Sequence, residues 1–315
     1  MGFVTTGLVD YIDEQQFPLI TKALAGGRTA SMITPVLGVK GPTELNMMDV
    51  DVNMSSDSGC TWDQSGNITY SQRLIDAKNV KINMEFCPKA LEQFYLRTQL
   101  APGAHTEALP FEEQFSNYLV EKIQDELEIV IWQGDASGAT GTNLDMFDGL
   151  LHDSASFVDC NTTAYGTVLI TLTMADAVEA VQRVYALAPS AAVAKGDFKI
   201  FCGLDVFRLF ASALANGAGM TSGGGQLANY QSDFDPLRMI FPGTNIEVVG
   251  VNGLTGQTKV VGMNLSNAHY GTDLQEDSSS LELWYTQDDR KLKVACEFTY
   301  GTQIAFLDQV GAVLI

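Results

Sequence analysis

The residue types that carry most catalytic chemistry are few in this chain and are not spaced for it. The only histidines are His105, His152 and His269, and the five cysteines include no C-x-x-C pair. A zinc site or a thioredoxin-like redox site is therefore not expected. His152 next to Asp153 could be read as an acid–base pair, but adjacent residues on a chain seldom face each other usefully.

Other chemical motifs are also missing. The glycine-rich segments 134–141 and 223–225 match neither G-x-G-x-x-G after a strand nor G-x-x-x-x-G-K-[ST], and no G-x-S-x-G elbow occurs. Asp273, Glu276 and Asp277 could offer oxygen ligands to a hard cation, but they lack the spacing of a calcium loop, which favours a solvated turn. We therefore expect no catalytic residue, no cofactor, no metal ion and no enzymatic role.

The composition favours a chain that associates with copies of itself. Hydrophobic residues make up 46% of the chain and charged residues 18%, whereas roughly a quarter is usual for charged residues. The net charge of −20 argues against tight or sequence-specific binding of nucleic acid, although it does not exclude a container for nucleic acid. The chain shows no secretory signal and no apolar run of about 18 residues, so no membrane partner is expected.

Alternation of apolar and polar residues is strongest between residues 39 and 86. It marks residues 48–54 and 80–86, with a polar, turn-rich stretch and residues 67–74 between them. A period of two predicts strands with one covered face, and together these segments predict a long two-stranded hairpin. A lone hairpin is marginally stable in water, so we expect it to lie on a neighbouring subunit.

A long amphipathic helix is predicted between Pro110 and Gly134. Glu112 and Glu113 suit its first turn, and apolar residues repeat every four positions along it. An inserted α/β module and closing strands follow. The predicted elements are a helix over 174–188, a strand over 198–202, a helix over 204–214 and strands over 246–251, 259–265, 281–285, 292–298 and 302–306.

This order of elements resembles the major capsid proteins of tailed bacteriophages, which have the Hong Kong 97-like fold. Two segments carry the resemblance most strongly: EEQFSNYLVEKIQDELEIVIWQGDASGATGTNLDMFDGLL and KLKVACEFTYGTQIAFLDQVGAVL. The resemblance implies an α+β fold in five parts. These are an N-terminal arm (1–38), an extended loop hairpin (39–86), a peripheral domain with a spine helix (87–170), an axial domain (171–268) and return strands of the peripheral domain (269–315).

The resemblance also implies a function. It points to a structural protein that self-assembles, through pentamers and hexamers, into an icosahedral shell enclosing double-stranded DNA without sequence-specific binding. A scaffolding protein and a portal would be further partners, and the protein would be found in the virion and, during assembly, in the host cytoplasm. An encapsulin-like cargo compartment is the nearest alternative. An intracellular α/β enzyme or ligand-binding protein is the alternative from another class.

The resemblance also suggests residues at contacts between subunits. In a cross-linking member of the family, a Glu after a Cys assists an isopeptide bond between a loop lysine and an asparagine seven residues before that Glu. Here Cys296-Glu297 matches the pair, but Arg290 replaces the asparagine, so this cross-link is not expected and Glu297 is expected to be buried or paired at an interface. The candidate contact residues are Trp62, Tyr70, Lys78 and Glu297, of which the two aromatics could instead pack within the hairpin.

Overall fold

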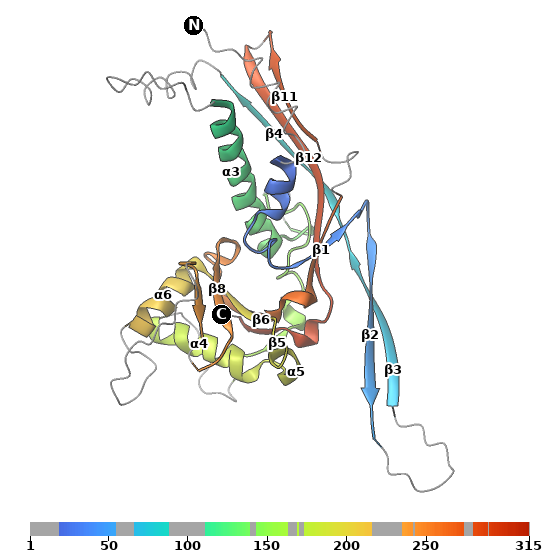
Figure 1. The fold of residues 1–315 in the computed structure, drawn as a ribbon, viewed down its shortest axis with the longest axis vertical. Coiled ribbons are helices and arrows are strands. Elements are labelled where there is room, and N and C mark those ends of the chain that lie inside the picture. The colour runs from blue at the N-terminus through green and yellow to red at the C-terminus, as the bar shows by residue number, and fades with distance from the viewer. Residues whose placement is uncertain are drawn as a thin grey trace.

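The fold is known from a computed structural model (Figure 1). The predictions for the first part of the arm, for Trp62 and for the glycine-rich segment 223–225 fall outside the residues that the structure describes. The described residues are 19–54, 66–87, 111–138, 143–162, 169, 173–215, 235–241, 243–273, 280–288 and 290–314.

A long strand, β12 (Lys291–Ile304), organises the first sheet. It pairs with β4 (Lys78–Phe86) on one edge and with β11 (Ser280–Thr286) and β10 (Ala268–Thr272) on the other, and β1 (Thr34–Leu37) adds to β10. The sequence predicted two strands, 292–298 and 302–306, in place of β12, which was wrong. The strand continues past Gly301 because residues 291–297 pair with β11 and residues 300–304 pair with β10.

The predicted hairpin exists but is shorter than expected. Strand β2 (Thr43–Val52) pairs with β3 (Gly66–Ile75) in an antiparallel ladder of ten residue pairs. The third predicted segment, here β4, does not belong to the hairpin but pairs with β12 from Lys78 to Phe86. The reason is burial, since Val80 of β4 lies in the core beside Phe298 of β12. Figure 1 shows the hairpin reaching away from the body.

The predicted amphipathic helix is confirmed as α3 (Phe111–Gln133). Its repeating apolar residues Leu119, Ile123 and Leu127 are buried against the face of the first sheet that carries Val294 and Phe298. Residues 19–25 are helical and add apolar side chains to the same core. No helix among the described residues is both long and apolar enough to cross a membrane.

The inserted α/β module is built on a six-stranded sheet. Helices α4 (Met174–Leu187) and α6 (Leu204–Ala215) cover one face through residues such as Val181 and Phe210, and the other face joins the α3 core through Phe201. A short helix, α5 (Ser190–Val193), follows α4. The strand order is β5 (Val158–Asp159), β13 (Gly311–Leu314), β9 (Lys259–Asn264), β6 (Phe198–Gly203), β8 (Glu247–Val251) and β7 (Arg238–Ile240).

The predicted domain boundaries do not coincide with the boundaries of the two sheets. Residues 269–315 were expected to return wholly to the peripheral domain, yet β13 pairs with β9 of the module sheet. Strand β5, expected in the peripheral domain, pairs with β13 in the same sheet. Ala312 and Val313 are fully buried and face the two different cores of the molecule. Between β5 and β9 both side chains are covered, so the chain returns to this sheet.

Candidate intersubunit surfaces

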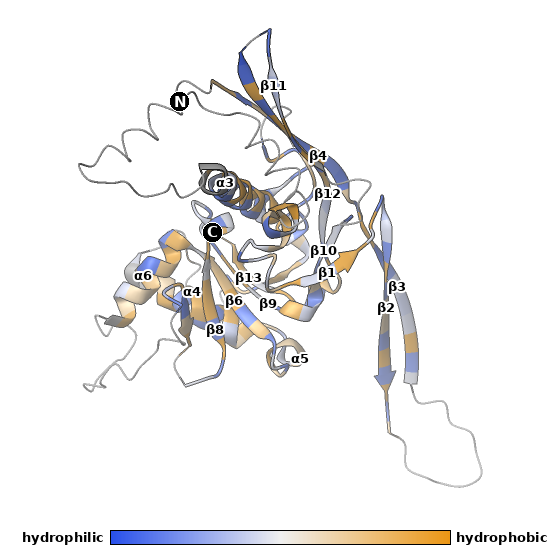
Figure 2. Ribbon diagram, turned by 45° about the horizontal axis from the view of Figure 1, so that its top comes forward, coloured by the Kyte–Doolittle hydropathy of each residue, from blue (hydrophilic) through white to orange (hydrophobic). Residues whose placement is uncertain are grey.

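The hairpin exposes a continuous apolar face. In the β2–β3 ladder, Met48 is opposite Tyr70 and Val50 is opposite Ile68, and Val52 follows on the same side. All five side chains are exposed, Tyr70 to 74% and Met48 to 58%. Figures 1 and 2 both show this hairpin away from α3 and from the module, so the chain's own core does not cover it. A patch of this kind on an extended arm is typical of an interaction site.

The base of the hairpin is firmly attached to the subunit. Ile75 is fully buried, and Gln303 Nε2 donates a hydrogen bond of 2.8 Å to the carbonyl oxygen of Leu74. Arg73 forms an ion pair with Asp153, in the loop that follows α3. His152, which the sequence places next to Asp153, lies close to Asp135 and Asp148 instead. The hairpin therefore projects from a fixed base.

A second apolar surface lies between α3 and β4. It is a groove of about 350 Å³, with a rim that carries Lys81, Lys122 and Glu126. The sequence did not indicate it, because the groove depends on which strand packs beside the helix. Its apolar lining comes from Val80, Ile82, Met84, Leu119, Ile123, Leu127, Val130, Met146, Phe147 and Phe298.

The predicted contact residues on β4 and β12 lie apart. Glu297 is exposed, with Lys81 opposite it on β4 and Ser280 opposite it on β11. Burial within the subunit is not observed, because Glu297 points to the outer side of the strand whose inner side carries Cys296 and Phe298. Pairing at an interface, the other expected alternative, stays a prediction. Lys78 is opposite Tyr300 and forms an ion pair of 2.7 Å with Asp76. In one subunit, Lys78 and Glu297 therefore do not meet.

The turn before β12 contains a residue in the left-handed backbone conformation. Arg290, which stands at the position of the missing asparagine, has a φ of 52°. This left-handed conformation is uncommon for residues other than glycine, asparagine and aspartate. Arg290 is exposed, so its role in the subunit is that of a turn residue.

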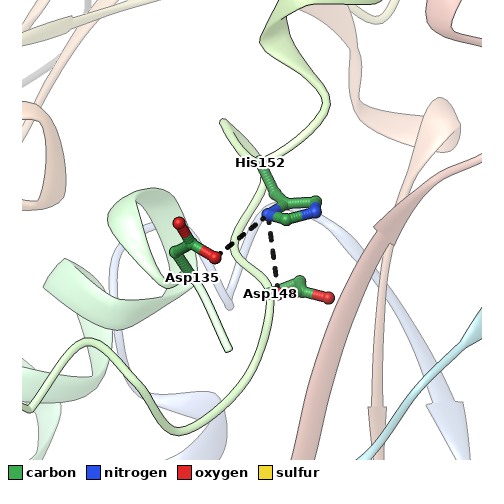
Figure 3. A group of neighbouring side chains, drawn as sticks. All are labelled: Asp135, Asp148 and His152. Carbon is green, nitrogen blue, oxygen red and sulfur yellow. Dashed lines mark ion pairs between the residues drawn. The ribbon is translucent and has the colours of Figure 1, made fainter. Parts of the chain in front are cut away.

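One group of side chains could offer three ligands to a cation, namely Asp135, Asp148 and His152 (Figure 3). His152 Nδ1 lies 3.7 Å from Asp135 Oδ1 and 3.5 Å from Asp148 Oδ1. The same carboxylates also hold the loop, because Ala136 N donates to Asp148 Oδ1 and Ser137 N donates to Asp135 Oδ1, both at 2.9 Å. The hydrogen bonds that Asp135 accepts from the Ser137 hydroxyl, at 2.6 Å, and from the Ser137 amide lower the pKa of its carboxyl group. The group connects the end of α3 to residues 143–157 and is largely open to solvent.

The described cysteines are poor nucleophiles with one exception. Burial raises the pKa of Cys160 and of Cys296 to about 11, and it raises the pKa of Cys202 further. Cys87 is the exposed thiol among them. Because thiolates are the reactive form, the three buried thiols stay inert near neutral pH.

The sequence matches no protein-family model, and no curated protein matches it. Solved structures do match the fold. A chain of the satellite phage P4 procapsid including the size determination (Sid) protein aligns with TM-score 0.60 and 10% identity over 94% of this chain and 98% of that one. A chain of Gordonia phage Cozz gives 0.58 and 10% over 91% and 85%. A chain of the native GTA particle capsid gives 0.54 and 10% over 93% and 90%.

The matches cover the first sheet, the spine helix and the module together, since each spans more than nine-tenths of this chain. At 10% identity, these structural matches show a shared fold and do not show a shared activity. The chain therefore has the α+β fold found in phage and GTA capsids, as the order of its elements predicts.

Proposed function

We propose that the chain is a major capsid protein with a Hong Kong 97-like fold, the structural subunit of an icosahedral shell that encloses double-stranded DNA. The observation that carries the proposal is the projecting β2–β3 hairpin with its exposed apolar face. A two-stranded hairpin alone is marginal in water, so a face of this kind needs a partner. The fold similarity supports the proposal by analogy.

We also propose the expected division of the subunit into parts, with two changes. We assign residues 1–38 to an N-terminal arm and the β2–β3 hairpin, with the loop that joins its strands, to the extended loop. Strand β4 belongs with α3 and β10–β12 in the peripheral domain. The axial domain comprises the module together with β5 and β13, which pair into its sheet.

Assembly would proceed through many weak contacts. The hairpin face, the α3–β4 groove and the contact candidates Tyr70, Lys78 and Glu297 give each subunit several surfaces for neighbours in pentamers and hexamers. Several sites that engage together bind far more strongly than each alone, which favours closed symmetric particles. A scaffolding protein and a portal would complete the assembly in the host cytoplasm before the shell becomes part of the virion.

The charge suits a container. With a net charge of −20, the subunit would repel packaged DNA on average and hold it by enclosure without reading its sequence. We expect the purified subunit to bind duplex DNA no more strongly than a nonspecific acidic protein does. A basic inner wall, or salt-dependent binding of DNA by the free subunit, would contradict this part of the proposal.

The test is the particle formed by the full chain when it is expressed with and without phage-derived partners. We expect closed shells in electron micrographs, and nuclease-protected DNA in particles from infected cells. Shells that instead retain a co-purifying host enzyme would support the encapsulin-like compartment. A protein that stays monomeric with every partner and binds a small molecule in the module would overturn the proposal in favour of a binding protein or enzyme.

A further inference from the structure

A buried carboxylate on α3 holds the turn formed by residues 26–33. Glu128 is only 4% exposed. Its oxygens accept hydrogen bonds from Thr29 N at 3.1 and 3.2 Å and from Thr29 Oγ1 at 2.5 Å. The same hydroxyl oxygen accepts a hydrogen bond of 2.7 Å from Trp132 Nε1. Thr29 thus bridges two α3 side chains that lie one helical turn apart.

The turn joins the N-terminal residues to the body of the subunit. Before it, the helical residues 19–25 bury Leu19, Ile20 and Leu24 in the α3 core, and after it β1 pairs with β10. The turn fits closely, because a Cβ on Gly27 would lie 3.2 Å from Glu128 Oε2. The turn that Glu128 holds therefore lies between the docked helical residues 19–25 and strand β1.

Within the part of the chain that the structure describes, Glu128 has no ion-pair partner in direct contact. None of the ion pairs found between described residues includes Glu128. The guanidinium of Arg28 forms an ion pair with Asp235, which also forms an ion pair with Arg238. From β12, Tyr300 faces Glu128, and burial keeps the pKa of this phenol well above its usual range, so it stays neutral. An ionised carboxylate here has lost its hydration without gaining a salt bridge.

We propose that Glu128 and the 26–33 turn form a proton-operated latch. In this latch the neutral carboxylic acid keeps the N-terminal segment docked on α3, and loss of the proton loosens it. Undocking the turn exposes the carboxyl group to water, and the charged form gains far more from hydration than the neutral form does. The latch is a property of the subunit and does not depend on the shell function.

The sign of the effect follows from the linkage between protonation and docking. Burial raises the pKa of Glu128, and this outweighs the Thr29 hydrogen bonds and the nearby Arg28, which lower it. In the undocked segment the pKa would return toward the ordinary value of about 4.3. Docking is therefore fully favoured below the undocked pKa and weakens as the pH rises through the docked pKa.

Hydrogen exchange on the full chain tests the latch directly. The amide of Thr29 donates to Glu128, so its protection factor, corrected for intrinsic exchange, reports docking. Because ionisation of Glu128 weakens docking, we expect the protection factor of Thr29 to fall as the pH rises from about 5 to about 8. A protection factor that is constant or rises over this range would overturn the proposal, whatever the variants do.

Two variants test whether Glu128 is the group whose titration controls docking. Glu128→Gln keeps the size and an acceptor oxygen but cannot titrate, so Thr29 should be equally protected at both pH values. Glu121→Gln changes an exposed acid on the same helix and should keep the wild-type pH dependence. If Glu121→Gln also removes the dependence, or if folded Glu128→Gln retains it, Glu128 is not the group responsible. If Glu128→Gln does not fold, the wild-type series decides.

Discussion

Tyr70 on β3 lies directly opposite Met48 on β2, and both side chains are exposed in the isolated subunit. Cross-strand pairs of this type stabilise a sheet by only about 0.2–1 kcal/mol. That gain does not account for two large apolar side chains facing water together with Val50, Val52 and Ile68. A neighbouring subunit that covers this face would account for them.

Placing a charge on this face should prevent assembly without unfolding the subunit. Tyr70→Asp removes an aromatic anchor, whose loss at the centre of an interface typically costs about 2 kcal/mol or more. An exposed substitution usually changes folding stability by no more than about 0.5 kcal/mol. We expect normal thermal unfolding of the subunit and a loss of particles measured by light scattering.

The matched control for this variant is Ser71→Asp, which adds the same charge to the opposite face of the same strand, across from Met47. It should assemble like the wild type. Equal loss of particles in both variants would mean that the charge of the hairpin matters and that its apolar face does not.

The ion pair at the hairpin base should contribute little to stability. Arg73 and Asp153 are both partly exposed, and pairs open to solvent contribute about 0–1 kcal/mol. We expect Arg73→Ala to lower the free energy of unfolding in urea by at most about 1 kcal/mol, but to speed hydrogen exchange at the hairpin base. Lys122→Ala, which breaks an exposed pair with Asp125, is the control, and it should leave exchange in the hairpin unchanged.

The continuity of β12 depends on a glycine. A Cβ on Gly301 would lie 2.8 Å from Ala77 Cα and 2.9 Å from the Asp76 carbonyl oxygen, so the backbone must shift to admit it. Gly301→Ala should therefore destabilise the fold by about 1–3 kcal/mol. Gly41→Ala, where a Cβ would meet open space, should cost almost nothing. Similar midpoints in urea for the two variants would contradict this packing.

The thiols should differ sharply in reactivity. Near pH 8, an alkylating reagent should label Cys87 rapidly and Cys296 slowly, because burial raises the pKa of Cys296 to about 11. The raised value also means that the folded state binds this proton more tightly. Its stabilising effect is present below the unfolded pKa of about 8.5 and is lost as the pH rises through about 11. Mass spectrometry of the labelled native protein measures both rates.

Much of the fold could be predicted from local sequence patterns. The apolar repeat of α3 and the alternation along β2 predict these elements because the signals lie within single segments. The partners of β4 and β13 could not be predicted, since pairing joins segments far apart in the chain. An unbroken β12 was missed because Tyr300 and Gly301 look like a turn when β10 is not seen beside them.

The candidate surfaces were predicted less completely than the fold. Tyr70 was identified because an aromatic residue on an alternating strand stands out in the sequence. Glu297 was expected to be buried or paired at an interface because of the family resemblance, and the alternation along β12 leaves its side chain exposed in the subunit. Glu128 was missed, since a Glu within an amphipathic helix looks like a solvated residue. Its spacing of four from Trp132 was the available signal.

The central claim is that this chain builds closed shells, and the most direct measurement is the mass and shape of the purified full chain. Light scattering over a range of concentrations, with negative-stain electron microscopy of the same samples, provides both. We predict shells or ring-shaped capsomers for the wild type and single subunits for Tyr70→Asp. A wild-type chain that stays monomeric throughout, alone and with its scaffolding partner, and that cannot be told from Tyr70→Asp would contradict the account.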